Sequence, residues 1–401
     1  MVEIWLPYGS SEIPVRVAEE RLVEILDGQA SHTSYDLTGE LGKSMGTNEA
    51  FLGAAKRARK ICIAVGSSSN ANASTSIIRA LVSSITAGTA LPSVTILRTA
   101  DAPVIEPDIF SDAKVVNHDS ASAVVPLPDL REANAPSVDQ TFAEADVAVV
   151  VGELKPHCLL ERSGLTDIIL PGLASSDSIQ NHLSSEGGSL ANIQKERIEI
   201  AGSIKNLFAA GFVLNADHSV VNFSFGDFHA VLKELDMPLR TTWTAKPKRT
   251  ADVVVMSAGG KPTDESLLRA VETFPQGLAA LKRGGALIVA AECALSHGGT
   301  EFYDWCAERK EPRYLEARLR HRFNYNGFKA ALFTRAVEAH RVYLVSTIPD
   351  HYVEGVFGMK AALTVNSALQ AAQRALGSDS DVCVIPDAAR IIVEEQQSGT
   401  A

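Results

Sequence analysis

Short, unbroken runs of apolar and β-branched residues recur along the chain, and they constrain its fold more than any other feature. The clearest lie at residues 61–65, 94–97, 147–151, 253–256, 286–289 and 342–345. Runs without polar alternation are typical of strands that are covered on both faces of a sheet. Helical patterns at 76–85, 267–281 and 361–376 separate these runs. This order predicts an α/β fold with mostly parallel sheets, together with one antiparallel pair, 212–215 with 220–225.

Residues 238–250 interrupt this rhythm, and we interpret them as the connection between two domains. The segment, PLRTTWTAKPKRT, contains two prolines and adjacent threonines, which disfavour a continuing helix or strand. Its basic residues are Arg240, Lys246, Lys248 and Arg249. They suit a solvated linker, and a site for an anion is the alternative. The sequence therefore predicts an N-terminal α/β domain over residues 1–245 and a C-terminal α/β domain over residues 246–401.

Charge and cysteine content limit the class of partner. The 401 residues include 37 Lys and Arg against 48 Asp and Glu, a formal charge of −11. Nucleic acids and anionic membranes both attract positively charged surfaces, so we expect neither as a partner. Five cysteines, none of them in a CxxC pair, favour a reducing compartment. With no signal-like N-terminus and no apolar run of about 18 residues, we expect a cytoplasmic protein with a small-molecule or protein partner.

The chain lacks the common phosphate-loop, dinucleotide-binding, zinc-protease and nucleophile-elbow motifs. Instead, three turns that leave predicted strands carry glycine or polar residues, at the place where open α/β sheets bind ligands. After the strand at 61–65, Ser67, Ser69 and Asn70 offer hydroxyl and backbone N–H groups to an anion. A plain turn and helix cap is the alternative interpretation of these residues.

The other two turns lie in the second half of the chain. After the strand at 253–256, Gly259 and Gly260 permit close approach of the backbone to a ligand, and Lys261 can face an anionic substrate. After the next strand, His297 beside two glycines is a candidate general base or metal ligand. A simple turn and a solvated loop histidine are the respective alternatives.

Residues 151–182, VGELKPHCLLERSGLTDIILPGLASSDSIQNH, carry the richest set of chemically useful side chains. Lys155 and His157 follow the predicted strand, and His182 falls on the next short helix. A long loop without periodicity in a compact domain is usually either functional or disordered. Two histidines that such a loop brings together suit acid–base catalysis or metal ligation, whereas either one alone is more often structural.

This loop resembles that of the lactate racemase family, enzymes that use a nickel-pincer nucleotide cofactor. The residues that match the family's pattern are Glu153, His157, Ser163, Gly164, Leu170, Pro171, Gly172, Leu173, Ala174 and His182. Shorter matches follow the family's order at residues 6–9, 226–227, 259–264, 284–285, 297–303 and 384–387. The resemblance implies an active site in a cleft between two α/β domains and inversion of the hydroxyl-bearing carbon of a 2-hydroxy acid. It further implies that His157 is one of two bases and that His182 binds nickel.

The chain departs from the family's pattern at several active-site positions. Asp167 stands where the resemblance places the lysine that tethers the cofactor through a thioamide, a bond that a carboxylate cannot form. Glu272 replaces a second lysine. The second base should directly follow the strand at 94–97, but no histidine occurs between His32 and His118. Residues 67–71 replace the phosphate-binding turn, and a tryptophan is missing around 326–328. We therefore expect a divergent member that retains the architecture and lacks the covalent chemistry.

These observations predict a racemase- or epimerase-like protein with a site for a 2-hydroxy acid or sugar acid. The nickel-pincer nucleotide would bind without a covalent bond, or no cofactor would bind at all. The candidate catalytic residues are His157, Lys155, Asp167 and His297; the candidate cofactor-binding residues are Ser67, Ser69, Asn70, Gly164, Gly259, Gly260 and Lys261; the candidate metal ligand is His182. Two alternatives stand beside this prediction. One is a catalytically silent ligand-binding relative, and the other is a hydrolase that holds zinc with His157, His182 and Asp167.

Overall fold

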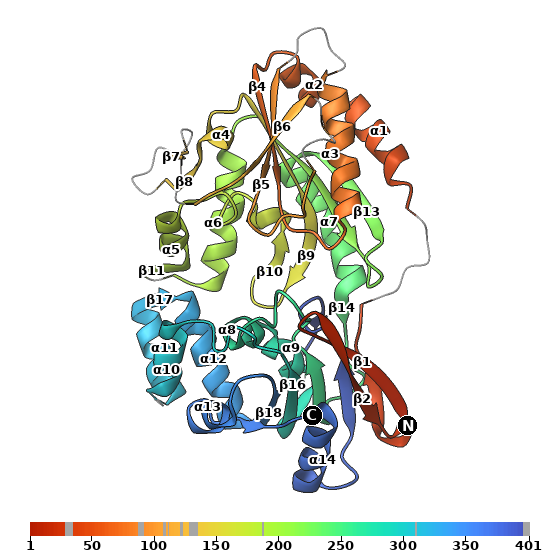
Figure 1. Cartoon of the computed structure of the whole chain (residues 1–401), viewed down its shortest axis with the longest axis vertical. Coiled ribbons are helices and arrows are strands. Elements are labelled where there is room, and N and C mark those ends of the chain that lie inside the picture. Colours follow the sequence, from red (N-terminus) through yellow and green to blue (C-terminus); the bar gives the residue numbers. More distant parts are fainter. Residues whose placement is uncertain are drawn as a thin grey trace, which may run out of the picture.

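The computed structural model describes residues 1–28, 35–86, 92–106, 110, 112–120, 123–127, 135–186, 188–308 and 311–395. It consists of two lobes, each built around its own sheet and stacked along the long axis of the molecule (Figure 1). Within those residues, no helix is long and apolar enough to cross a membrane.

The first lobe contains a seven-stranded sheet with the order β13-β12-β9-β4-β5-β6, in which β10 also pairs with β9. Its strands are β4 (Lys60–Val65), β5 (Ser93–Arg98), β6 (Ala113–Asn117), β9 (Val147–His157), β10 (Glu161–Gly164), β12 (Leu207–Leu214) and β13 (Val220–Asp227). β13 and β10 are antiparallel to their neighbours and the other pairings are parallel. The predicted strands of this half and the antiparallel pair are confirmed, and β9 extends to His157.

Helices cover both faces of this sheet. One face packs against α1 (Leu37–Thr47), α2 (Glu49–Ala55) and α3 (Ala71–Thr86), and the other against α4 (Gln140–Ala143), α6 (Leu190–Ser203) and α7 (Phe228–Trp243). In α3, Ile77, Ile78 and Leu81 are buried at helical spacing, which is why this element was readable from its pattern. Also in this lobe are α5 (Ser176–Leu183), the 3-10 helix η3 (Leu165–Asp167) and the pair β7 (Val124–Pro126) with β8 (Ser137–Asp139).

The second lobe contains a six-stranded sheet with the order β19-β18-β16-β15-β20-β3, and every pairing in it is parallel. Its strands are β3 (Leu22–Ile25), β15 (Ala251–Ser257), β16 (Leu281–Ala290), β18 (Arg341–Val345), β19 (Lys360–Ala361) and β20 (Val382–Ile385). The predicted strands at 253–256, 286–289 and 342–345 are confirmed as β15, β16 and β18. The expected α/β class with mostly parallel sheets is therefore confirmed.

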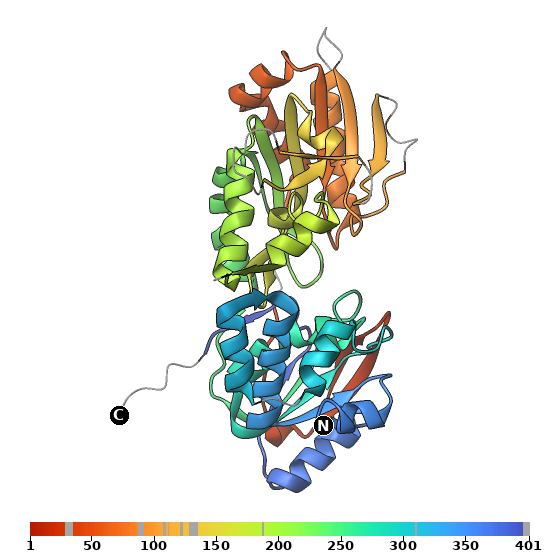
Figure 2. The ribbon, with the colours of Figure 1, turned by 90° about the vertical axis from the view of Figure 1, so that its left-hand side faces the viewer.

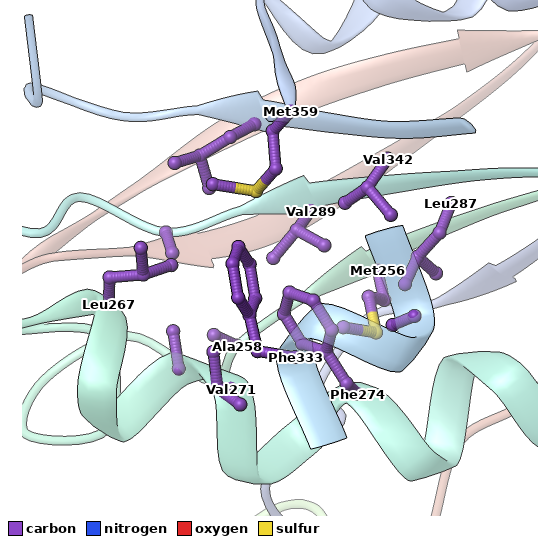
Figure 3. Packing of buried hydrophobic residues seen from close by; sticks show 14 of the residues in the cluster. Met256, Ala258, Leu267, Val271, Phe274, Leu287, Val289, Phe333, Val342 and Met359 are labelled. Atoms are coloured by element: carbon purple, nitrogen blue, oxygen red, sulfur yellow. The ribbon is translucent and has the colours of Figure 1, made fainter. Parts of the chain in front are cut away.

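The two faces of the second sheet are covered differently. One face packs against α8 (Leu267–Ala270), η4 (Val271–Thr273), α9 (Phe274–Ala279), α10 (Thr300–Ala307), α11 (Pro312–His321), α12 (Tyr325–Ala339) and α13 (Asp350–Gly355). Figure 3 shows Phe274 and Phe333 beside Met256 and Val289 of the sheet, and the two ring centroids lie 6.0 Å apart. Truncating a buried phenylalanine costs about 3–5 kcal/mol, so these rings anchor the lobe. The other face carries α14 (Val365–Leu376).

The N-terminal segment belongs to the second lobe, which corrects the expected first domain over residues 1–245. β3 pairs with β20, and the hairpin of β1 (Val2–Tyr8) and β2 (Ser11–Val17) packs on the same sheet, joined to β3 through η1 (Glu19–Arg21) (Figure 2). Leu6 and Val15 of the hairpin are fully buried there. The hairpin has one apolar face, and which sheet covers that face depends on residues more than 200 positions away.

The expected connection at 238–250 is also shorter than predicted. α7 continues through Pro238 to Trp243, whose buried indole donates a hydrogen bond to the Leu214 carbonyl at 2.8 Å. Tertiary packing of this helix thus outweighs the helix-breaking tendency of proline. In the basic cluster, Arg249 pairs with Asp381 and Arg240 pairs with Asp236 of its own helix, so these arginines are neutralised within the chain.

Two other helices differ from the predicted ones at their boundaries. The pattern at 267–281 is divided into α8, η4 and α9, because Pro275 opens a new first turn. The pattern at 361–376 begins as a helix only at Val365, after the Thr364 hydroxyl caps it. The lobes meet through two short pairs, β11 (Ser184–Glu186) with β17 (Arg322–Asn324) and β14 (Thr244–Ala245) with β21 (Ile392–Val393).

Candidate functional site between the lobes

A cavity of about 1060 Å³ lies between the two lobes. In the first lobe its wall is formed by residues that follow β4, β5 and β6 and by the end of β9. In the second lobe it is formed by residues that follow β15 and β20 and by η4. Parallel sheets bind ligands beyond the carboxyl ends of their strands, and both sheets present that edge to the cavity. Small-molecule sites usually measure about 300–1,000 Å³, so this one can hold a hydroxy acid or a larger sugar acid.

The cavity brings together most of the predicted site residues. Those in its wall are Ser67, Ser69, Lys155, His157, Gly164, Asp167, Gly259 and Lys261. Asn70, Gly260, His182 and His297 are not part of the wall. Asn70 caps α3 by accepting the Ala73 N–H at 2.9 Å, as the capping alternative predicts. His297 instead packs on Tyr303, with the ring centroids 5.0 Å apart, so the structure gives no support to its predicted role as a general base in this cavity.

His157 ends β9 and faces the second lobe. Its Nδ1 accepts the backbone N–H groups of Leu159 at 3.1 Å and Leu160 at 3.3 Å. Its Nε2 lies 3.5 Å from Oε2 of Glu272 in η4. Burial lowers the pKa of His157, and the negative charges of Glu272 and Asp167 oppose that effect. Because Nδ1 accepts two hydrogen bonds, the neutral ring carries its proton on Nε2.

Asp167 is held by a network inside the first lobe. Its Oδ1 accepts from Arg197 Nη1 at 2.7 Å and its Oδ2 accepts the Gly164 N–H at 3.1 Å. The Arg197 side chain, only 6% exposed, also donates from Nε to His182 Nε2 at 3.1 Å. On the other side of the ring, His182 Nδ1 lies 2.6 Å from Glu196 Oε2. The guanidinium therefore separates Asp167 from His182, and both ring nitrogens of His182 have partners.

This network does not fit the nickel-pincer nucleotide that the resemblance implies. A nickel ligand needs a lone pair on His182, yet Nε2 accepts from Arg197 and Nδ1 donates to Glu196. At the position of the tether, a carboxylate is paired with the same guanidinium. A buried cation between the two positions also repels a metal ion. The residues at the matching positions therefore offer neither a tether nor a free nickel ligand.

The same contacts overturn the zinc hydrolase alternative. Zinc requires ligand atoms that converge at about 2.0–2.2 Å, whereas Arg197 lies between His182 and Asp167. Over the part of the chain that the structure describes, no group of three His, Cys, Asp or Glu side chains is arranged to hold a metal ion.

Lys155 and the turn after β4 form the cationic part of the wall. Lys155 Nζ donates to Ser67 Oγ at 3.1 Å, and no ion pair of Lys155 occurs among the residues described. The Ser69 N–H donates to Glu153 Oε2 at 2.9 Å. Glu153, 1% exposed, is paired in turn with Arg390 of the second lobe at 3.0 Å. The predicted anion site is thus occupied at Ser69 by the chain's own carboxylate, and Ser67 with Lys155 is left to face a ligand.

Two glycines shape the wall sterically. Gly164 has φ +81°, and a Cβ there would lie 2.1 Å from the Glu153 carbonyl oxygen. Gly259 has φ +96°, and a Cβ there would lie 2.6 Å from Asp387 Oδ1. Burial raises the pKa of Asp387 to about 6, although the charge of Arg390 opposes this effect. Gly164 therefore lets β10 lie close to the backbone of β9, and Gly259 lets the Asp387 carboxylate approach the backbone of the cavity wall.

The basic partners of the site escaped the sequence interpretation. Lys329 on α12 is 5% exposed, and its Nζ lies 2.9 Å from Glu272 Oε1. Arg197 sits among the buried residues of α6, beside Ile193 and Ile200. A charged residue within the apolar stripe of a helix was the available signal, because such a residue must find a buried partner.

His118 was also missed. It follows β6, the strand next to β5, and lines the cavity. Its Nδ1 lies 3.0 Å from Asp139 Oδ2 and its Nε2 lies 3.4 Å from the Ala174 carbonyl oxygen. Both ring nitrogens therefore point at protein acceptors, so this histidine ties the wall together and does not replace the missing second base.

A two-lobed α/β protein with a polar small-molecule cavity between its sheets is the class that this geometry defines. Family models described as the lactate racemase N-terminal domain and the lactate racemase C-terminal domain match residues 8–189 and 246–393. The chain belongs to the lactate racemase family.

Individual relatives agree with this assignment. The chain is 32% identical over 308 residues to the lactate racemase of Thermoanaerobacterium thermosaccharolyticum, covering 72% of this chain and 71% of that protein. It is 27% identical over 303 residues to the lactate racemase of Lactiplantibacillus plantarum, with coverage of 72% and 71%. The solved structure of the T. thermosaccharolyticum lactate racemase apoprotein superposes with a TM-score of 0.80 at 26% identity, covering 98% of this chain and 100% of that chain. The predicted family and fold class are confirmed.

Proposed function

We propose that this chain binds a small 2-hydroxy acid or sugar acid in the cavity between its lobes and acts as a racemase- or epimerase-like member of its family. The relatives that share its sequence are named as racemases of lactate, a 2-hydroxy acid. The cavity, formed by both lobes, is large enough for such a ligand.

The observation that carries this proposal is the Lys155 ammonium in the cavity wall. Its partner is the Ser67 hydroxyl, and it forms no ion pair within the described part of the chain. An ammonium beside a hydroxyl is suited to a carboxylate, because charge-assisted hydrogen bonds to it are stronger than neutral ones. The ligand's carboxylate would therefore lie at Lys155.

The test is a titration of the wild type and Lys155→Met with D-lactate, L-lactate and D-gluconate, by calorimetry and thermal shift. We expect binding to the variant to weaken by about tenfold or more, because hydrogen bonds to charged groups contribute about 1.5–3 kcal/mol. Lys246→Met, on the exposed connection outside the cavity, is the matched control and should bind like the wild type. Equal affinity of Lys155→Met and the wild type would contradict the proposal.

A catalytically silent ligand-binding relative is the second candidate. The observation in its favour is that Asp167 and Glu272, which replace lysines of the family pattern, are held in ion pairs by Arg197 and Lys329. Chiral chromatography of each bound acid after incubation separates the candidates. Inversion supports the racemase-like function, and binding without inversion supports the silent one.

We also propose that no nickel-pincer nucleotide is attached to this chain. Intact mass and nickel analysis of protein co-expressed with cofactor-making enzymes test this. We expect the mass of the unmodified polypeptide and no nickel that survives dialysis, because His182 and Asp167 are already paired with Arg197. A stoichiometric nickel content would refute this part of the proposal.

A further inference from the structure

His157 is oriented as a hydrogen-bond donor toward the cavity. Its Nδ1 accepts two backbone N–H groups, from Leu159 and Leu160, and so carries no proton. For Nε2 to accept a proton from a neutral ligand, the ring's own proton would first have to move to Nδ1. There it would point at the two backbone N–H groups. His157 therefore presents Nε2–H to a ligand, which is the opposite of the role as a base that the resemblance implies.

Glu272 supplies the matching acceptor from the other lobe. Lys329 Nζ lies 2.9 Å from Oε1 of Glu272, and the same ammonium lies 4.6 Å from the centroid of the Tyr325 ring. Because Lys329 is buried, its contact with Oε1 holds the Glu272 carboxylate in place. The second oxygen, Oε2, is the one that faces His157, and Glu272 is part of the cavity wall.

The distance between these two groups leaves both with capacity to bind a ligand. Nε2 of His157 and Oε2 of Glu272 are 3.5 Å apart, which is longer than the usual 2.7–3.2 Å of an N–H···O hydrogen bond. A hydroxyl lying alongside both can accept from Nε2–H and donate to Oε2. A keto oxygen can also accept from Nε2–H, but it has no hydrogen to donate to the carboxylate. Its lone pairs would face the negatively charged Oε2, which is unfavourable.

From this geometry we infer that His157 and Glu272 form a hydroxyl-selecting pair, which makes the site prefer a 2-hydroxy acid over the corresponding 2-keto acid. This inference rests on the proposed function and adds the residue, Glu272, that accepts the ligand's hydroxyl hydrogen. Sites that hydrogen-bond a ligand hydroxyl discriminate strongly against analogues without it, because their buried polar groups are left unpaired.

Calorimetric titration with L-lactate, D-lactate and pyruvate tests the pair. For the wild type we expect the better-bound lactate to bind about tenfold more tightly than pyruvate. Glu272→Gln should reduce this ratio to about threefold or less, because an amide can accept from a hydroxyl or donate to a keto oxygen. Glu354→Gln, an equal charge change on exposed α13, should keep the wild-type ratio. An unchanged ratio in Glu272→Gln overturns the inference.

Two further measurements keep the test decisive. If Glu272→Gln does not fold because Lys329 loses its partner, the double variant Glu272→Gln/Lys329→Met, which removes both charges, is titrated in its place. In ¹⁵N-histidine NMR of the wild type we expect His157 to be neutral and protonated on Nε2 at pH 7, and a ring protonated on Nδ1 overturns the inference. Binding of lactate and pyruvate with equal affinity overturns this inference alone. Binding of neither acid, together with no binding of D-gluconate, overturns the proposed function with it.

Discussion

The two histidines of segment 151–182 occupy opposite environments. His182 is enclosed by its own lobe, donates from Nδ1 to Glu196 and accepts at Nε2 from Arg197. His157 accepts backbone N–H groups at Nδ1 and turns Nε2–H toward Glu272 in the other lobe, at a distance too long for a complete hydrogen bond.

This difference supports the proposed role of His157 at the cavity and places His182 in the internal packing of the first lobe. A ring with both nitrogens satisfied inside one lobe holds that lobe together and has nothing left to bind. A ring whose N–H lacks a close acceptor, and which faces a carboxylate on the other lobe, can still donate a hydrogen bond to a ligand. Both residues match histidines of the family pattern, but their surroundings differ. The chemistry expected of each ring therefore depends on its hydrogen-bond partners more than on its position in that pattern.

The largest expected effect comes from breaking the enclosed network. Arg197→Met leaves Asp167 and His182 without their shared cation, and removal of one partner from a buried pair costs about 3–5 kcal/mol. Denaturant unfolding measures this loss. Arg240→Met, which removes an exposed pair on α7, should cost about 0.5 kcal/mol. Similar losses in the two variants would show that the network does not stabilise the first lobe.

Asp387 sharpens the contrast, because it is a cavity carboxylate whose burial is not fully compensated. Its pKa is raised from 3.8 to about 6 in the folded chain. Between these values the folded state binds more protons at Asp387 than the unfolded state. The contribution of Asp387 to the free energy of unfolding is therefore greatest below pH 4 and falls as the pH rises through 6. One pKa unit corresponds to about 1.4 kcal/mol. In the wild type, Asp387 should therefore lower the free energy of unfolding by about 3 kcal/mol between pH 4 and pH 7, and Asp387→Asn should lack this decrease.

Unfolding free energies of the wild type and Asp387→Asn, measured from pH 4 to pH 7, test this expectation. The other titrating groups are common to both proteins and cancel in the difference between the curves. Parallel curves would mean that Asp387 titrates in the folded chain as it does in the unfolded one.

The smallest effects compare the two histidines directly. His182→Gln should lower stability by about 2 kcal/mol, since one amide cannot replace both ring contacts and a buried partner is left unsatisfied. His157→Gln should cost about 1 kcal/mol or less and weaken lactate binding about tenfold, because the donor at the cavity is displaced. Thermal unfolding and calorimetry of both variants measure this difference. The reverse order of the two effects would invert the assignment of structural and functional roles.

Much of the fold followed from local patterns. The apolar runs at β4, β9 and β15 specify buried strands because a parallel sheet covered on both faces excludes polar residues at every position. The N-terminal strand β3 was not predicted, since Leu22–Ile25 is short, lies at the edge of the sheet and is only partly buried. The predicted connection at 238–250 starts too early, because the packing of Trp243 offsets the effect of Pro238 and α7 continues to Trp243.

Only part of the candidate site could be predicted from local sequence patterns. Lys155, His157 and Asp167 lie close together in sequence at the end of β9, so strand and loop chemistry was enough to gather them. Their partners come from other elements: Arg197 lies 30 residues beyond Asp167, and Lys329 lies 57 residues beyond Glu272. Periodicity records which face of an element is buried and carries no information on which distant side chain meets it. The α/β class, most strands and the family pattern are therefore encoded locally. The protonation of each histidine and the pairing of His182 with Arg197 depend instead on contacts between residues that are distant in the sequence. The physical reason is that hydrogen bonds and ion pairs act over a few ångströms, and only folding brings such residues that close.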